Sequence, residues 1–157
     1  MQGLLYSGKK EFLQHKVIPL LRNADASTQP KWGKMSFQHM VEHMVLVMKN
    51  ANGKLKAEMK TPPENIQAFQ DFIMSDKIFR ENTKSPAFPE EPLPLRFSSV
   101  EEGINKLETE IKDFFNVYEA TPDLKITNPV FGDLDYDHAL TLLYKHAQHH
   151  LKQFGLL

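Results

Sequence analysis

The chain has 157 residues, 41% of them hydrophobic, which predicts one globular domain that spans residues 1–157. Its 19 Lys and Arg residues against 20 Asp and Glu residues give a formal net charge of -1, which lacks the basic excess that nucleic-acid binding requires. Cysteine is absent, which excludes disulfides, thiolate metal sites and cysteine nucleophiles. Any transition metal must therefore bind histidine and carboxylate side chains.

The N-terminal stretch MQGLLYSGKKEF has no apolar run of the length that a signal peptide needs. No later segment approaches the ~18 apolar residues of a membrane-spanning helix. We therefore expect a soluble cytoplasmic protein with neither a membrane nor a nucleic acid as partner.

Helical periodicity in the first third of the chain predicts two helices. The first covers about residues 8–24, and Pro19 should kink or break it because the proline ring removes a backbone hydrogen bond. The second begins after Ser36, a plausible N-cap, and ends at the Asn52-Gly53 stop signal. Its sequence, FQHMVEHMVLVMKNA, predicts about four turns of apolar helix.

A long proline-rich crossover follows, from Gly53 to Phe97, and contains six of the ten prolines. Inside it, Thr61-Pro62-Pro63-Glu64 has the form of a capping box with proline at the first helical position. Apolar residues at helical spacing follow this box, so we expect a short helix within the crossover.

Two further helices are predicted in the last third of the chain. One begins at Ser98, with Glu101 three residues later, and reaches about Tyr118. The other begins after Asp135 and ends near Gly155. The only extended runs, LPLRF and LKITNPVF, contain or adjoin proline and are weak strand signals. The predicted fold is all-α, a four-helix bundle with the crossover between helices 2 and 3.

Three histidines occur within the stretch KHAQHHLKQFG, residues 145–155. At 100° per residue, His150 falls inside the apolar arc of the last helix, His146 on its edge, and His149 outside it. Spacing of i and i+4 lets the rings of His146 and His150 converge on one ion. His43 lies on the rim of the apolar stripe of the second helix and would supply a third nitrogen; His39 lies farther out and is the second choice.

A structural interpretation competes with this one, because histidines at a core edge often bond only to backbone carbonyls. Met35, Met40, Met44 and Met48 are expected to fill the core. Gln148, Lys145, Lys152 and the acidic residues of the third helix are expected to form solvated faces. The sequence has no Glu-x-x-His, HExxH, GxSxG or phosphate-binding glycine loop.

Two segments carry a resemblance to a known family. NPVFGDLDYDHALTLLYKHAQHHLKQFG resembles the C-terminal signature of one branch of the DinB-like, YfiT-type four-helix bundles, and WGKMSFQHMVEH resembles the start of that branch's second helix. The resemblance covers the chain from about Gly8 and implies a metal site at His43, His146 and His150. Asn128 stands where many relatives have histidine, which implies an altered activity if they use that histidine.

The resemblance also implies a choice of functions. Family members with known roles are similar to thiol-dependent transferases or isomerases and to metal-dependent hydrolases. We therefore expect a metal-dependent hydrolase or thiol-dependent transferase that uses Zn²⁺ or Ni²⁺ and acts on a small-molecule substrate, with a low-molecular-weight thiol as one candidate partner. Homodimer formation is a further expectation. The alternatives are a non-catalytic bundle with structural histidines that acts in self-association or partner binding, and a former enzyme that still binds an ion.

Overall fold

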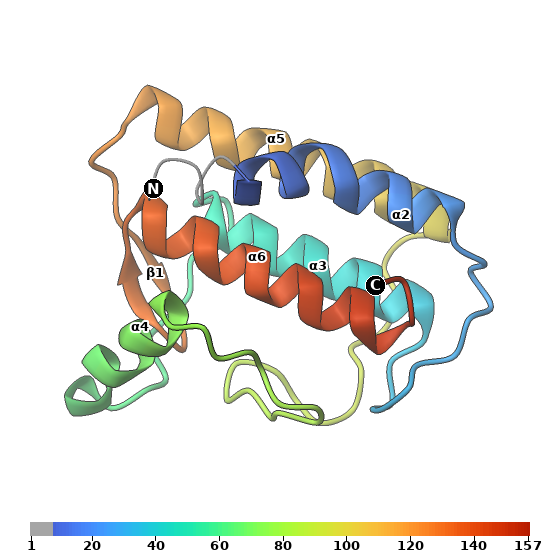
Figure 1. Ribbon diagram of the computed structural model, residues 1–157, viewed down its shortest axis with the longest axis horizontal. Helices are drawn as coiled ribbons and strands as arrows, with labels where there is room; N and C mark the ends of the chain where they lie inside the picture. Colours follow the sequence, from blue (N-terminus) through green and yellow to red (C-terminus); the bar gives the residue numbers. More distant parts are fainter. Residues whose placement is uncertain (1–7) are drawn as a thin grey trace.

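The computed structural model describes residues 8–157, and long helices run side by side along its longest dimension (Figure 1). The first helical segment occupies residues 8–23 and includes a π-helical turn, η1 (Phe12–Lys16), and α2 (Val17–Asn23). The other long helices are α3 (Phe37–Ala51), α5 (Val100–Ala120) and α6 (Tyr136–Gln153). The first segment lies along α5, and α6 lies beside α3 (Figure 1). The predicted all-α bundle is confirmed.

Pro19 does not break the first helical segment. The chain instead forms a π-helical turn directly before the proline, in which the N–H of Val17 donates to the carbonyl of Phe12. A proline ring crowds the carbonyl four residues earlier, and a wider π turn relieves this crowding while the helix continues. Leu13, Val17, Ile18 and Leu21 remain buried on one side of the segment.

The helices that carry the three candidate histidines begin at the predicted caps. The Ser36 hydroxyl accepts from the N–H of His39, and the Asp135 carboxylate accepts from the N–H of His138. Such N-caps fix the helix starts because they satisfy backbone donors that have no partner within the helix. At the other end of α3, Gly53 has a φ of +86°, which favours glycine.

One local prediction was wrong, and one weak strand signal proved to be a strand. The Thr61 hydroxyl does not cap a helix but donates to the carbonyl of Val130, and the crossover helix begins as a 3-10 turn, η2 (Pro63–Asn65), followed by α4 (Ile66–Met74). The linker before α6 forms an antiparallel hairpin of β1 (Ile126–Asn128) and β2 (Gly132–Leu134). β1 lies within the extended run LKITNPVF, which is a weak strand signal because a strand of three residues beside a proline gives only a short alternation.

The third long helix also starts one residue later than predicted. Its N-cap is Ser99, whose hydroxyl accepts from the N–H of Glu102, while the Glu102 carboxylate accepts from the N–H of Ser98. Both serines precede an acidic first turn, so the sequence alone does not distinguish them.

The crossover between α4 and α5 is fastened to the bundle at both ends. At its start, the Lys145 ammonium of α6 donates to the carbonyls of Ser75 and Lys77. At its end, the buried Glu42 carboxylate of α3 accepts from the backbone N–H of Arg96 and Phe97. The intervening segment passes below α3 and α6 (Figure 1) and is therefore held close to the helices that carry the histidines.

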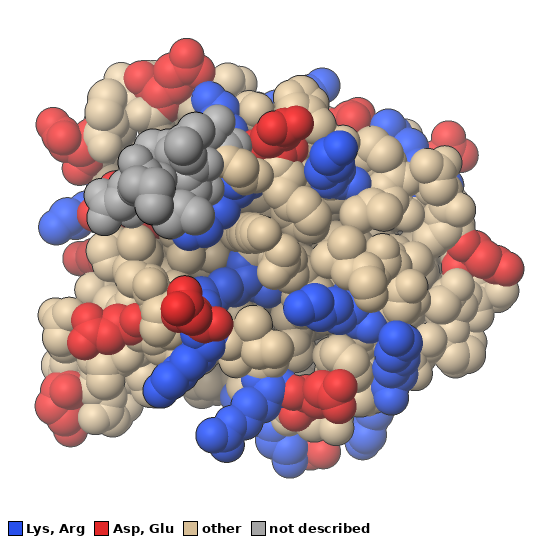
Figure 2. All heavy atoms as spheres, viewed as in Figure 1, with Lys and Arg blue, Asp and Glu red and all other residues tan. Residues whose placement is uncertain are grey.

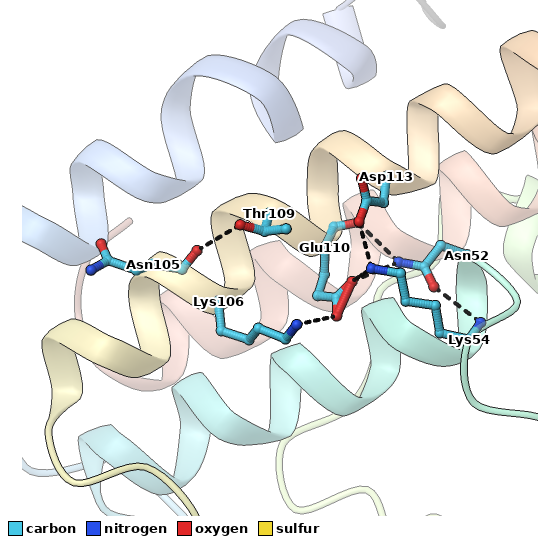
Figure 3. A network of polar contacts seen from close by, with 7 residues as sticks. All are labelled: Asn52, Lys54, Asn105, Lys106, Thr109, Glu110 and Asp113. Carbon is cyan, nitrogen blue, oxygen red and sulfur yellow. Dashed lines mark hydrogen bonds and ion pairs between the residues drawn. The ribbon is translucent and has the colours of Figure 1, made fainter.

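A buried carboxylate joins α3 to α5 (Figure 3). Glu110 of α5 is 0% exposed, although the acidic residues of this helix were expected on a solvated face. Its carboxylate accepts from Lys54 and from Asn52, the C-cap of α3, and pairs with Lys106 at 3.4 Å. Burial raises the pKa of Glu110, but the hydrogen bonds from Lys54 and Asn52 and the charges of Lys106 and Lys54 outweigh burial and lower it.

Within residues 8–157, none of the helices combines the length and apolar character that a membrane span needs. Residues 1–7, the start of the stretch predicted to contain no signal peptide, lie outside the described residues.

Candidate metal centre

The side chains of His43, His146 and His150 converge between α3 and α6. The Nε2 atom of His146 is 2.9 Å from Nε2 of His43 and 3.1 Å from Nε2 of His150. One ring nitrogen from each residue lies within 4.8 Å of the others. His150 is 7% exposed, and the other two side chains are partly buried. The structure thus brings together the three residues that the helical wheels selected: the pair on α6 and His43 of α3, which lies 103 residues before His146 in the sequence.

Burial keeps the three imidazoles neutral. It lowers the pKa of His43 to about 4, with a smaller contribution from the charge of His149. Burial, followed by the charges of His150 and His43, holds the pKa of His146 well below its usual value. The pKa of His150 is also well lowered, by burial and by the charge of His43. At neutral pH each ring therefore has an unprotonated nitrogen, the form that binds metal ions.

Gln153 fixes the orientation of the His150 ring. Its side-chain Nε2 donates to the carbonyl of Trp32 at 2.9 Å, so its Oε1 faces His150 Nδ1 at 2.8 Å. An amide oxygen only accepts, so Nδ1 carries the proton and Nε2 of His150 keeps its lone pair toward the cluster. Gln153 is 3% exposed, which excludes competing water from this bond.

Gly33 allows the loop before α3 to approach Gln153. Its φ is +83°, and a Cβ atom at this position would lie 3.0 Å from Gln153 Nε2. A side chain there would therefore both strain the backbone and displace the amide. The glycine of the WGKM motif is explained by this close approach.

The arrangement fits a divalent cation better than a network of neutral rings. Two nitrogens bound to one tetrahedral Zn²⁺ at about 2.0–2.1 Å lie about 3.3 Å apart, close to the 2.9 and 3.1 Å that separate Nε2 of His146 from its two neighbours. Without a cation, Nε2 of His146 has either one proton or one lone pair and faces two neighbouring nitrogens. It cannot satisfy both neighbours with full hydrogen bonds, whereas one cation accepts all three lone pairs.

Three of the four remaining histidines of the described chain take other roles. In His39, the second choice, Nδ1 accepts from the backbone N–H of Ser36, which completes the capping box of α3. His138 bonds through Nδ1 to Asp135 at the start of α6. His149 is not part of the three-histidine cluster, and its ring contacts those of Trp32 and Phe79, with centroids at 5.4 and 5.8 Å.

The crossover supplies a side chain to the cluster. The ring of Phe88 meets the ring of His43 edge to face, with centroids 4.7 Å apart. Periodicity cannot identify this contact, because Phe88 lies in a proline-rich segment without a repeating pattern.

The family model of the DinB superfamily matches residues 13–154, a range that contains the whole of α2, α3, α4, α5 and α6 and all three clustered histidines. The chain belongs to the DinB superfamily. No curated protein and no solved structure gives a significant match. The family predicted from the two motifs is thus confirmed, while membership of one particular branch stays a prediction.

Asn128 and Lys145 of this DinB superfamily protein make structural contacts, while an altered activity through Asn128 stays a prediction. Asn128 accepts from the N–H of Val130 and Phe131, so its side chain stabilises the hairpin turn. Lys145, expected on a solvated face, is bonded to the crossover. Gln153 received no role from the sequence, although its position three residues after a buried histidine could have indicated one.

Proposed function

We propose that this DinB superfamily protein is a metal-dependent enzyme in which His43, His146 and His150 hold one divalent ion, Zn²⁺ or Ni²⁺. The observation that carries the proposal is the convergence of three neutral Nε2 atoms, with 2.9 and 3.1 Å between neighbours. When bound, such an ion acts as a Lewis acid and lowers the pKa of a water or thiol, which becomes a nucleophile at neutral pH.

The surrounding residues support catalysis in distinct ways. Gln153 holds the His150 ring with its Nε2 toward the cluster, and burial prevents protonation of the ligand nitrogens. Phe88 covers one side of His43 with an apolar ring, which keeps water from that side. Because only three protein nitrogens converge within the described residues, coordination positions are left for a substrate or water.

Metal content tests the proposal directly. Protein prepared without an affinity tag should contain about one Zn²⁺ or Ni²⁺ per chain, since three histidines with an open position form a complete protein site. The variant His150→Ala should lose the ion. His39→Ala, the matched control, should retain it, because His39 bonds to Ser36 and not to the cluster. Low metal content in the wild type and in His150→Ala alike would contradict the proposal and favour structural histidines.

Cobalt substitution separates the thiol-dependent and hydrolytic alternatives. The chain has no cysteine, so a thiolate-to-cobalt absorption band in the Co²⁺ protein can only come from an added thiol. Such a band, lost in His150→Ala, would support thiol-dependent transfer. Its absence, together with hydrolysis of activated esters by the wild type alone, would favour a hydrolase.

Gln153 offers a test of how the site is oriented. Gln153→Leu should weaken Zn²⁺ binding about 10- to 100-fold, because the Nδ1 proton of His150 loses its acceptor. Gln153→Glu keeps an acceptor and should retain affinity even if it costs stability through the lost bond to Trp32. Competition with a chromogenic chelator measures both, and Gln148→Leu on the same helix is the control. Equal affinities for all four proteins would exclude the orienting role.

A further inference from the structure

A pocket of about 290 Å³ lies beside the histidine cluster, between the loop before α3, the start of the crossover and α6. Its volume is near the lower end of small-molecule sites. The residues that matter for its chemistry are Lys31, Trp32, Phe79, Lys145, His149 and Lys152.

The pocket carries a basic wall. Lys145, His149 and Lys152 follow one another at i, i+4 and i+7 and therefore share one face of α6, while Lys31 approaches from the loop. Glu81 is the single acidic residue of the lining, so three lysines leave the pocket with an excess of positive charge. In Figure 2, basic side chains are seen along the exposed side of α6 and toward the crossover below it.

The lysines of the pocket differ in how many ammonium hydrogen-bond donors they can offer to a ligand. Lys145 uses two of its three N–H groups on the carbonyls of Ser75 and Lys77, which leaves one donor. Lys31 and Lys152 are exposed. A ligand anion could therefore be held by two exposed ammonium groups and by the Lys145 ammonium, which the crossover already holds in place.

Aromatic rings form the other part of the pocket. Trp32 and Phe79 both contact the ring of His149, which in turn lies 5.1 Å from the ring of His150. The pocket is thus separated from the histidine cluster by a single imidazole. Flat apolar walls beside ammonium groups suit a molecule that combines an anionic group with an apolar or planar part.

We propose that this pocket binds the anionic portion of a small organic substrate, a carboxylate or a phosphate ester, beside the metal centre. The role of the ligand as substrate depends on the proposed metal-dependent function, whereas its binding does not. A ligand that fills the pocket lies next to His149 and therefore within one side chain of His150.

The single tryptophan of the chain makes the pocket directly observable, since Trp32 lines it. The metal-free protein is titrated with phenylacetate, with phenyl phosphate and with neutral phenylacetamide while Trp32 fluorescence is followed. At least one anion should give a saturable change that added salt weakens, and the amide should give none at the same concentrations. The stronger of the two anions identifies carboxylate or phosphate as the preferred group.

Paired variants locate the binding. Lys31→Ala/Lys152→Ala removes two exposed ammonium groups and should weaken binding of the preferred anion roughly 5- to 30-fold. Lys112→Ala, an exposed lysine of α5, should leave it unchanged. Three outcomes would each overturn the pocket proposal. The amide could change the fluorescence as much as the anions do, neither anion could give a saturable change, or the double variant could bind the preferred anion as tightly as the wild type does. Because the titration uses metal-free protein, these outcomes are independent of whether the histidines bind an ion.

Discussion

Saturation of the histidine cluster with Zn²⁺ is expected to stabilise the protein by about 4 kcal/mol when free ion reaches about 1,000 times its dissociation constant. In a chain of this length, that gain should raise the melting temperature by roughly 8–16 °C. The physical reason is that the folded state holds three neutral nitrogens in place for the ion, whereas the unfolded chain separates His43 from the pair on α6. Differential scanning calorimetry with Zn²⁺ and with a chelator measures the shift.

Variants of the cluster show whether the shift comes from these three residues. His146→Ala removes the ring whose Nε2 faces both others, so its melting temperature should be nearly the same with ion and with chelator. His15→Ala, an exposed histidine of the π-helical turn, should retain the full shift. Should the wild type melt at one temperature in both conditions, the three histidines would be structural.

The second large effect concerns the carboxylate between α3 and α5. Lys54→Met/Lys106→Met leaves Glu110 buried with only Asn52 as a side-chain partner and should lower the free energy of unfolding by about 3 kcal/mol or more at pH 7. Glu110→Leu should cost much less, because both lysines are partly exposed and can turn to water. Adding Glu110→Leu to the double variant should restore most of the lost stability.

Urea unfolding measures these differences, and pH gives an independent check. The pKa of Glu110 is lowered in the folded state, so the unfolded chain takes up its proton at the higher pH. The stability from the network is therefore fully present above about pH 4.5 and lost as pH falls through the folded pKa. The difference in free energy of unfolding between the wild type and the double variant should narrow below about pH 4.5.

Arg22→Ala is the control for the double variant. It breaks an exposed ion pair with Glu108 and should change the free energy of unfolding by less than about 1 kcal/mol. If the double variant loses no more free energy of unfolding than Arg22→Ala does, the network around Glu110 contributes little to stability.

Local signals predicted most of the helical framework. The caps at Ser36 and Asp135 and the turn at Gly53 depend on neighbouring residues only, so they can be seen in sequence. The start of α5 shifted by one residue because two serines compete for the same role. The hairpin gave only a weak strand signal, in the run LKITNPVF. The uncapped start of α4 was missed because the Thr61 hydroxyl bonds to the carbonyl of Val130, a residue distant in sequence.

The contrast between local signals and contacts distant in sequence also explains which parts of the histidine cluster could be predicted. A period of 3.6 residues places His146 and His150 on one face of a helix in any fold, so the sequence by itself determined the pair. That residues 1–157 form one domain likewise stays a prediction from length and composition. Only the tertiary structure placed His43 at 2.9 Å from His146, because the register of α3 against α6 follows from packing along both helices. The tertiary structure also placed Gln153 in contact with Trp32, Phe88 in contact with His43, and Glu110 beside its lysine partners. Most of these contacts join segments that are far apart in the sequence, so no local sequence pattern could predict them.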